Sequence, residues 1–194
     1  MLDVKKNDNG MVEALLRKGM EQDADSSLAA TSPTNISKPE GSSMVVFSGD
    51  LDKAIASFII ANGAAASGKK VTMFFTFWGL NVIRKHEKVQ VDKSMMGRMF
   101  GAMMPRGSRK LSMSKMNMMG MGAKMIRGVM KNNNISSLED LMQTALDQGV
   151  EIVACQMSMD VMGIAKEELI DGVKIGGVGY YLGKADESGI NLFI

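Results

Sequence analysis

The chain contains one cysteine and one histidine, so few side chains can supply a nucleophile or a base. Cys155 directly follows VEIVA, a run typical of a buried strand, and precedes a short helix predicted from near Ser158 to Gly163. A cysteine just before a helix N-terminus meets aligned backbone amides, which favour the reactive thiolate form. Free cysteines are also often buried as small hydrophobes, so a structural role for Cys155 stays open.

Other reaction chemistry has little support in the sequence. His86 follows Arg84 and Lys85 at a predicted helix end, a position that does not indicate a Ser–His–Asp or Cys–His centre. The glycines of segment 176–179 lack the GxGxxG frame of nucleotide-binding loops. One cysteine excludes a disulfide framework, and no Cys/His spacing suits structural zinc. We therefore expect no metal and no cofactor.

The elements that must position Cys155 begin near residue 44. The apolar run 44–47 (MVVF) predicts a short strand, and Asp50 can cap the helix that follows. Apolar residues at helical spacing predict that helix over about 17 residues, ending at Gly68, where glycine allows a left-handed cap. A second apolar run, 71–75, predicts the next strand. Strand, helix and strand of this kind indicate a parallel sheet covered on both faces.

The same pattern returns in the second half of the chain. Ser137 and Asp140 have the spacing of a capping box, and Gly149 ends the helix that they begin. The next strand is predicted over 150–154, directly before Cys155. Further strands are predicted at 173–175 and 190–194, with a helix over 178–187 between them. We therefore predict an α/β fold, a three-layer α/β/α sandwich with a mostly parallel sheet of about five strands.

Ligands of open parallel sheets bind at the carboxyl ends of the strands, because loops and helix N-termini converge there. Three such strand ends can be named, and only the third carries a nucleophile, Cys155. The residues that we expect to shape a pocket around it are Gly49, Asp50, Thr76, Trp78, Gln156 and Ser158.

A basic, methionine-rich insert, about residues 93–123, interrupts this pattern. Of the 21 methionines, 11 lie between Met95 and Met125. From Lys93 to Lys131 there are nine lysines or arginines and no acidic residue, whereas the rest of the chain is acidic. Two apolar stripes at helical spacing lie in or beside it: Met95, Met96, Met99, Phe100 and Met103, before Pro105, and Met125, Ile126, Val129 and Met130.

Three roles for the methionines can be compared. Thioethers are ligands for Cu(I), but nothing else in the chain points to copper handling. Flexible, polarizable side chains on a basic scaffold suit a hydrophobic partner, another subunit or an anionic membrane surface. Alternatively, the two stripes pack on each other and on the sheet. The last two alternatives stay open.

Residues 1–42 are predicted to be an N-terminal arm or linker, and residues 43–194 the α/β domain. The N-terminus has no apolar segment of signal-peptide length. The longest apolar run, 71–83, is shorter than the roughly 20 residues of a membrane-spanning helix and predicts a buried strand that enters a helix. We expect a cytoplasmic location and no nucleic-acid partner.

Three stretches resemble the DsrE/DsrF/DsrH superfamily of sulfur-relay proteins, in particular a DsrE-like branch with a methionine-rich insert. The resemblance covers about residues 43–194. The stretches are SGDLDKAIASFIIANGAAASGKKVTMFFTFWGL (48–80), the MMPRG and MNMMGMG sequences of the insert, and VACQMSMDVMGIAKEELIDGV (153–173).

The resemblance implies a three-layer α/β fold, homo-oligomers or hetero-oligomers such as trimers and hexamers, and sulfur carriage as a cysteine persulfide. Cys155 stands where the superfamily places its reactive cysteine. Some members have a second cysteine nearby, but Met157, Ser158 and Met159 occupy that neighbourhood here, so no intramolecular disulfide can form.

We therefore expect a sulfurtransferase-type sulfur carrier, in which Cys155 accepts sulfane sulfur from a donor protein and passes it to a partner thiol. The alternative is a non-enzymatic interaction module. In that alternative the basic methionine-rich insert docks a partner or an anionic membrane surface, and Cys155 is structural.

Overall fold

The computed structural model describes residues 40–91, 97, 99, 101 and 103–194. They belong to one unit of the chain, Lys38–Ile194. The predicted arm, residues 1–42, lies outside the described residues apart from residues 40–42, of which Gly41 and Ser42 belong to the first strand. The division into an arm and a domain stays a prediction.

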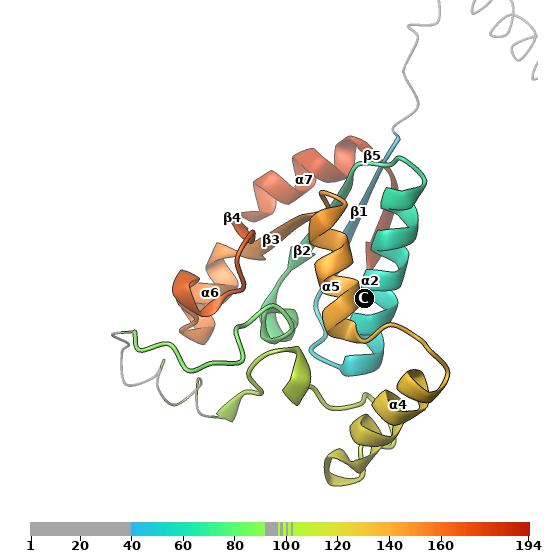
Figure 1. The fold of residues 1–194 in the computed structure, drawn as a ribbon. Helices are drawn as coiled ribbons and strands as arrows, with labels where there is room; N and C mark the ends of the chain where they lie inside the picture. Colours follow the sequence, from blue (N-terminus) through green and yellow to red (C-terminus); the bar gives the residue numbers. More distant parts are fainter. Residues whose placement is uncertain (1–39, 92–96, 98, 100, 102) are drawn as a thin grey trace, which may run out of the picture. The chain divides into compact units, whose positions relative to one another are not determined.

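Five strands form one parallel sheet in the spatial order β4-β3-β2-β1-β5 (Figure 1). In the register of the central strands, Met44 lies opposite Met73, and Met73 lies opposite Ile152. The prediction of a parallel sheet of about five strands is confirmed. The strands are β1 (Gly41–Val46), β2 (Val71–Phe75), β3 (Glu151–Cys155), β4 (Lys174–Gly176) and β5 (Ser188–Phe193).

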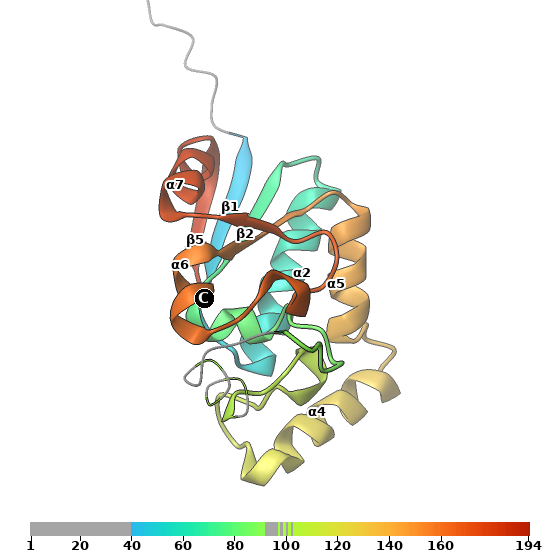
Figure 2. The same cartoon turned by 90° about the vertical axis from the view of Figure 1, so that its left-hand side faces the viewer.

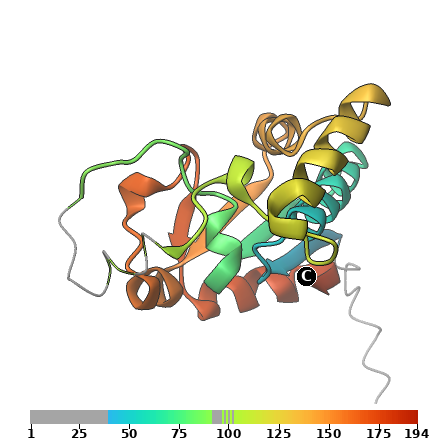
Figure 3. The same ribbon diagram turned by 90° about the horizontal axis from the view of Figure 1, so that it is seen from below.

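Helices cover both faces of the sheet, as the side view in Figure 2 shows. The helices α2 and α5 pack together on one face, and α7 lies on the other. The helix α4 lies beyond one end of α2 and α5 (Figure 1), and Figure 3 shows the same three layers from below. The predicted three-layer α/β/α sandwich is confirmed. The helices are α2 (Leu51–Ala66), α4 (Met121–Asn132), α5 (Leu138–Asp147), α6 (Gln156–Met162) and α7 (Val178–Asp186).

Short helical turns join these elements. The turn η1 follows β2 directly, so the predicted helix after this strand is a single tight turn. The described part of the chain holds no helix that is long and apolar enough to cross a membrane. The turns are η1 (Phe77–Asn81), η2 (Ser108–Lys110), η3 (Met118–Gly120) and η4 (Lys166–Glu168).

Local sequence signals explain most helix ends. Ser137 and Asp140 form the predicted capping box, in which Ser137 Oγ accepts a hydrogen bond from the Asp140 amide. Gly68 and Gly149 have φ of +79° and +76°, the left-handed conformation that glycine adopts most easily. Asp50 stands at the N-cap of α2, but its side chain does not cap the helix.

The capping expectation for Asp50 is wrong because other groups engage its carboxylate. Ser48 Oγ donates to Asp50 Oδ2 at 2.8 Å, and Lys53 Nζ lies 3.2 Å from the same oxygen. A carbonyl of the insert caps the helix instead, since the Leu51 amide donates to the backbone oxygen of Ser112 at 2.8 Å.

A buried ion pair lies beside the apolar core. The side chains of Arg84 and Glu168 are both 0% exposed, and Arg84 Nη2 lies 3.0 Å from Glu168 Oε1. Arg106 Nη2 also lies 3.0 Å from this oxygen. Arg106 belongs to the basic loop of the insert, so the pairing fixes that loop to the α/β body. Buried charges of this kind need their partners, because water cannot solvate them.

The second predicted apolar stripe lies on α4, and only part of it is buried. Met130 is buried and Ile126 packs against the core, whereas Met125 and Val129 are 59% and 47% exposed. One side of this stripe therefore packs inward and the other is exposed, so both alternatives for the methionines stay open. In the first stripe, Met95, Met96 and Phe100 lie outside the described residues, while Met99 and Met103 are helical and exposed.

Candidate active site around Cys155

Cys155 is the last residue of β3 and the N-cap residue of α6. The expected helix after it is present as α6, but it begins at Gln156, two residues before the predicted start, and Gly163 is its C-cap, with a left-handed φ of +62°. The cysteine is free and only 5% exposed. The chain thus places its single thiol at a strand end, directly before a helix, but covers it almost completely.

The thiol belongs to a small apolar cluster on the α7 face of the sheet. Phe74, Val153 and Cys155 form the buried part of this cluster, and Val45 and Tyr181 pack against it. The rings of Phe74 and Tyr181 lie 5.2 Å apart between centroids. Because Tyr181 belongs to α7, this helix forms the cover over the cluster that contains Cys155.

The N-terminus of α7 lies close to Cys155 along the sheet. Cys155 pairs with Gly176, the last residue of β4, and Gly177 is the N-cap of α7. A Cβ at position 176 would lie 3.0 Å from Val153 Cγ1 and 3.3 Å from a ring carbon of Tyr180. A side chain at position 176 would therefore crowd Val153 and Tyr180, so glycine favours the close approach of β4, α7 and the Cys155 strand, which the sequence pattern alone does not reveal.

Two pairs among the predicted pocket residues meet. The hydroxyl oxygens of Thr76 and Ser158 lie 2.7 Å apart, and Ser158 is fully buried. A Cβ on Gly49 would lie 2.8 Å from the Trp78 carbonyl oxygen, so the turns after β1 and β2 are in contact. The expected convergence of the strand ends is therefore present at these four residues.

The side chains of two predicted pocket residues, Asp50 and Gln156, form hydrogen bonds with residues other than Cys155. The side chain of Asp50 bonds with Ser48 and Lys53 rather than lining a pocket with Cys155. Gln156 is exposed, and its Nε2 donates to Asp160 Oδ1 at 2.8 Å along the surface of α6. Trp78 is 49% exposed and lies at the rim of the turn after β2.

The residues that pack around the thiol were absent from the prediction. The sequence pattern indicates only that Phe74 and Val45 are core residues of strands and that Tyr181 belongs to a helix at the surface. Alternation along β3 could have identified the face, because Val153 and Cys155 are two residues apart, and Phe74 of β2 lies opposite Val153. The identity of the covering helix depends on the crossover from β4 to β5, which no local pattern specifies.

The described residues contain no group of three or more His, Cys, Asp or Glu side chains placed to hold a metal ion. The nucleophile that the arrangement offers is the thiol of Cys155. One sulfur at the end of a parallel strand can attack an electrophilic sulfur or be modified, provided that the cover opens.

Known proteins are similar to this chain over more than three quarters of its length. The uncharacterized protein YrkE of Bacillus subtilis strain 168 is 52% identical over 151 residues, which are 78% of this chain and 94% of that protein. The sulfur carrier protein DsrE2 of Allochromatium vinosum is 36% identical over 155 residues, 78% of this chain and 96% of that protein. The ychN protein of E. coli, known from a crystal structure, aligns with a TM-score of 0.46 at 11% identity, over 79% of this chain and 99% of that chain.

A family model matches residues 39–193, which include every strand of the sheet and Cys155. The match extends over most of the chain and agrees with the resemblance read from the sequence. The chain belongs to the DsrE/DsrF/DrsH-like family.

Proposed function

We propose that this protein is a sulfur carrier that holds sulfane sulfur as a persulfide on Cys155 and passes it to a partner thiol. The family and the similarity to a sulfur carrier protein support a role in sulfur relay. The observation that carries the proposal is the position of the single thiol, at the carboxyl end of β3 and the N-cap of α6.

The proposed transfer is a thiol exchange on sulfur. The Cys155 thiolate attacks the outer sulfur of a donor persulfide, a new S–S bond forms, and the donor's S–S bond breaks, so that its electron pair leaves on the donor thiolate. A thiosulfonate donor would release a sulfinate in the same way. An acceptor thiolate then attacks the outer sulfur on Cys155, and the Cys155 thiolate is the leaving group. No net oxidation occurs in either step.

The residues around Cys155 would shield a persulfide from solvent and from other thiols. Phe74 and Tyr181 give the thiol an apolar environment, and a side chain that is 5% exposed gives bulk reagents little access. A persulfide held there is shielded from unspecific thiols. We infer that a donor reaches the sulfur when α7 shifts, so that binding of the partner would determine when transfer occurs.

Intact-mass measurement after incubation with a persulfide donor tests the proposal. The wild-type chain should gain the mass of one sulfur atom and lose it on addition of an acceptor thiol. The Cys155→Ser variant is the matched control, because the chain has no other cysteine. Equal loading of this variant, or no loading of a folded wild-type protein, would contradict the proposal.

We also propose that the protein forms homo-oligomers through the α7 side, in trimers or hexamers. Val178 and Leu182 of α7 are 66% and 54% exposed, and Phe193 of β5 is 72% exposed. Apolar side chains gathered on one layer favour burial against a second copy. Light scattering should show an oligomer, which Leu182→Glu should weaken while Lys166→Glu on a different element should not. A monomeric wild-type protein would contradict this assembly.

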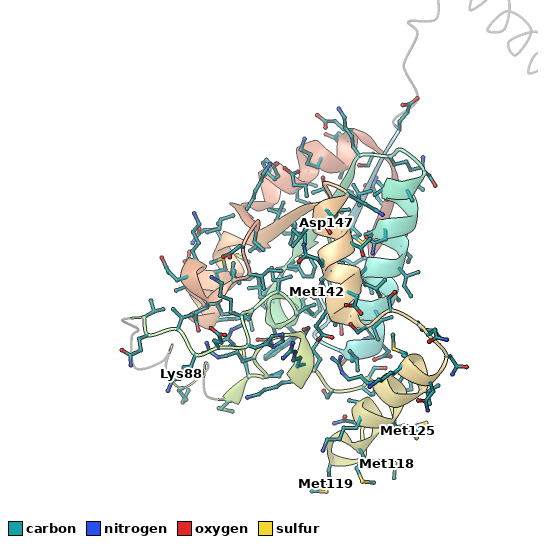
Figure 4. All side chains as sticks on the ribbon, in the orientation of Figure 1. Lys88, Met118, Met119, Met125, Met142 and Asp147 are labelled. Atoms are coloured by element: carbon teal, nitrogen blue, oxygen red, sulfur yellow. The ribbon has the colours of Figure 1, made fainter. Side chains whose placement is uncertain are left out.

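A second candidate function concerns the methionine surface, which we define as Met118, Met119, Met121, Met125 and Val129. Met119 is fully exposed, and the others are between 47% and 62% exposed. Figure 4 shows Met118, Met119 and Met125 at the outer end of the α4 region. Lys115, Lys124 and Lys131 flank this surface and are exposed.

An anionic lipid surface is the binding partner that fits the exposed methionines and lysines of the methionine surface. Exposed thioether side chains can enter the lipid boundary, and lysines pair with acidic headgroups. Sedimentation with vesicles of phosphatidylglycerol and phosphatidylcholine tests the idea. Wild-type protein should sediment with these vesicles and not with phosphatidylcholine alone, and Met118→Ser with Met119→Ser should weaken the binding. Sulfur loading on Cys155 that persists in this variant would separate docking from carriage.

A further inference from the structure

A cavity of about 850 Å³ lies away from the proposed sulfur site. It opens between α5 and the segments 84–86 and 170–174, whereas Cys155 packs under α7. None of the residues predicted for the sulfur site lines it. Its volume is in the range of small-molecule sites, which extends over about 300–1,000 Å³.

One wall of the cavity is apolar. Met142, Val150 and Ile152 are buried and line this wall, and Met142 is labelled on α5 in Figure 4. Leu146 and Ile170 extend the same surface. This wall can accept a hydrocarbon body, because it offers no hydrogen-bonding side chain to a ligand.

The opposite wall is charged, and its acidic groups already have partners. Asp171 Oδ1 lies 3.0 Å from Lys85 Nζ, and Glu139 Oε2 lies 3.1 Å from Arg127 Nη1. Lys174 likewise pairs with Glu151. Arg109 lines the cavity and has no acidic partner within the described part of the chain. Among the described residues, the charge on this wall that no ion pair neutralises is therefore the positive charge of Arg109.

A buried donor on the same wall is also unsatisfied. Arg84 lines the cavity, and its Nη2 and Nη1 reach Glu168 at 3.0 Å and Asn81 Oδ1 at 3.4 Å. Its Nε is buried without a hydrogen-bond partner. Because the Arg84 side chain is 0% exposed, this donor lies behind the cavity surface, whereas Arg109 is an exposed cation of the lining.

The pKa of His86, the single histidine, depends on the charges of this wall. His86 lines the cavity, and Ser108 Oγ lies 3.4 Å from its Nε2. Burial lowers the pKa of His86, and the positive charges of Arg109 and Arg127 lower it further, against Glu139 and Glu87. An anion bound beside the ring would oppose these charges and raise the pKa.

We propose that this cavity binds a small amphipathic organic anion, with its hydrocarbon body on the Met142–Ile152 wall and its acidic group at Arg109, beside His86. The site is independent of Cys155 chemistry. It matches the pattern of ligand pockets, in which an apolar lining is combined with a few polar groups that fix orientation. An inorganic anion would leave the apolar wall unused, and a neutral alcohol would leave the positive wall unpaired.

Titration of the full-length protein with octanoate, followed by the NMR signals of the His86 ring, tests the proposal. Octanoate should shift these signals saturably and raise the pKa of His86. Octanol and inorganic sulfate at the same concentrations should bind much more weakly. Equal effects of octanol, or no shift with octanoate at millimolar concentration, would overturn the proposal.

Three variants identify the site. Arg109→Ala should weaken octanoate binding about tenfold, because it removes a charge-assisted contact. Lys110→Ala, the matched control from the same basic loop, lies outside the cavity lining and should bind as the wild type does. Gln143→Trp, at an exposed lining position of α5, should block the cavity. Unchanged affinity in both Arg109→Ala and Gln143→Trp would place the octanoate elsewhere and refute the site.

Discussion

Thr76 Oγ1 and Ser158 Oγ lie 2.7 Å apart and join the turn after β2 to the helix that begins directly after Cys155. Both residues are buried, so neither hydroxyl has free access to water. The contact bridges the ends of two neighbouring strands. It therefore fixes the start of α6 relative to β2, and with it the backbone around the thiol.

Replacement of Ser158 by alanine should destabilise the protein by about 1–3 kcal/mol, because the hydroxyl of Thr76 is left buried without its partner. Urea unfolding measures this change. Ser67→Ala is the control, since Ser67 makes a hydroxyl contact on the exposed end of α2 and should cost much less. If the double variant Thr76→Val, Ser158→Ala were no more stable than the sum of the single variants predicts, the two hydroxyls would not be coupled.

Truncation of Tyr181 should expose Cys155. The ring packs against the cluster that contains the thiol, so Tyr181→Ala should accelerate alkylation of the native protein by iodoacetamide at least several-fold. Tyr180→Ala is the matched control, because Tyr180 is an exposed neighbour whose hydroxyl donates to Glu151. Mass spectrometry follows the rate. Equal rates in the two variants would show that α7 does not govern access to the thiol.

The fold was predictable because local and global signals agree. Continuous apolar runs mark β1, β2 and β3, and the capping box at Ser137 and the glycines at 68 and 149 mark helix ends. Each signal depends only on neighbours in sequence. Asp50 shows the limit, because its carboxylate is diverted by Ser48 and Lys53 and a carbonyl from residue 112 replaces the cap.

The candidate site was predictable only in part, for a physical reason. The strand-end rule brings Thr76, Ser158 and Cys155 to one edge of the sheet, since parallel strands share a direction. It does not say which face a side chain takes or which helix covers that face. Tyr181 reaches the Cys155 cluster only because the crossover from β4 to β5 carries α7 across the sheet, a long-range feature.

The buried carboxylate of Glu168 should be the least replaceable charge in the described unit. Glu168→Gln leaves the guanidinium of Arg84 without its counter-charge in the core, and the loss of one partner of a buried pair costs about 3–5 kcal/mol. Asp171→Asn is the control, because Asp171 is 96% exposed and its contact with Lys85 is worth at most about 1 kcal/mol. Thermal unfolding of the two variants should differ clearly, and similar values would contradict the structural role of the buried pair.

Gly79 should tolerate no side chain. A Cβ at this position would lie 2.1 Å from the carbonyl oxygen of Val46, so Gly79→Ala must displace the backbone of β1 or η1. We expect a loss of about 1–3 kcal/mol or more in urea unfolding. Gly63→Ala in α2 meets nothing within 4 Å and should instead stabilise the helix by about 0.5–1 kcal/mol. Effects of the same sign in the two variants would be inconsistent with this packing.

Protonation of His86 should oppose folding. Burial and the nearby charges of Arg109 and Arg127 hold its pKa below the ordinary value of 6.5, although Glu139 and Glu87 act in the opposite direction. The unfolded chain therefore binds a proton more readily than the folded protein does. By linkage, the stability contributed by neutral His86 is complete above the unfolded pKa and is lost as the pH falls from that value to the folded one.

Removal of the charge at Arg109 should raise the pKa of His86 toward its ordinary value, because Arg109 is the strongest of the charges that act on the ring. The single histidine makes the NMR titration unambiguous. Arg109→Ala should also lessen the loss of stability that His86 causes as the pH falls below the ordinary pKa of 6.5. Lys110→Ala, which removes the adjacent charge of the same loop, should shift the His86 pKa less. A pKa that stays the same in Arg109→Ala, or that falls, would show that burial alone depresses it and that the positive wall of the cavity does not act on the ring.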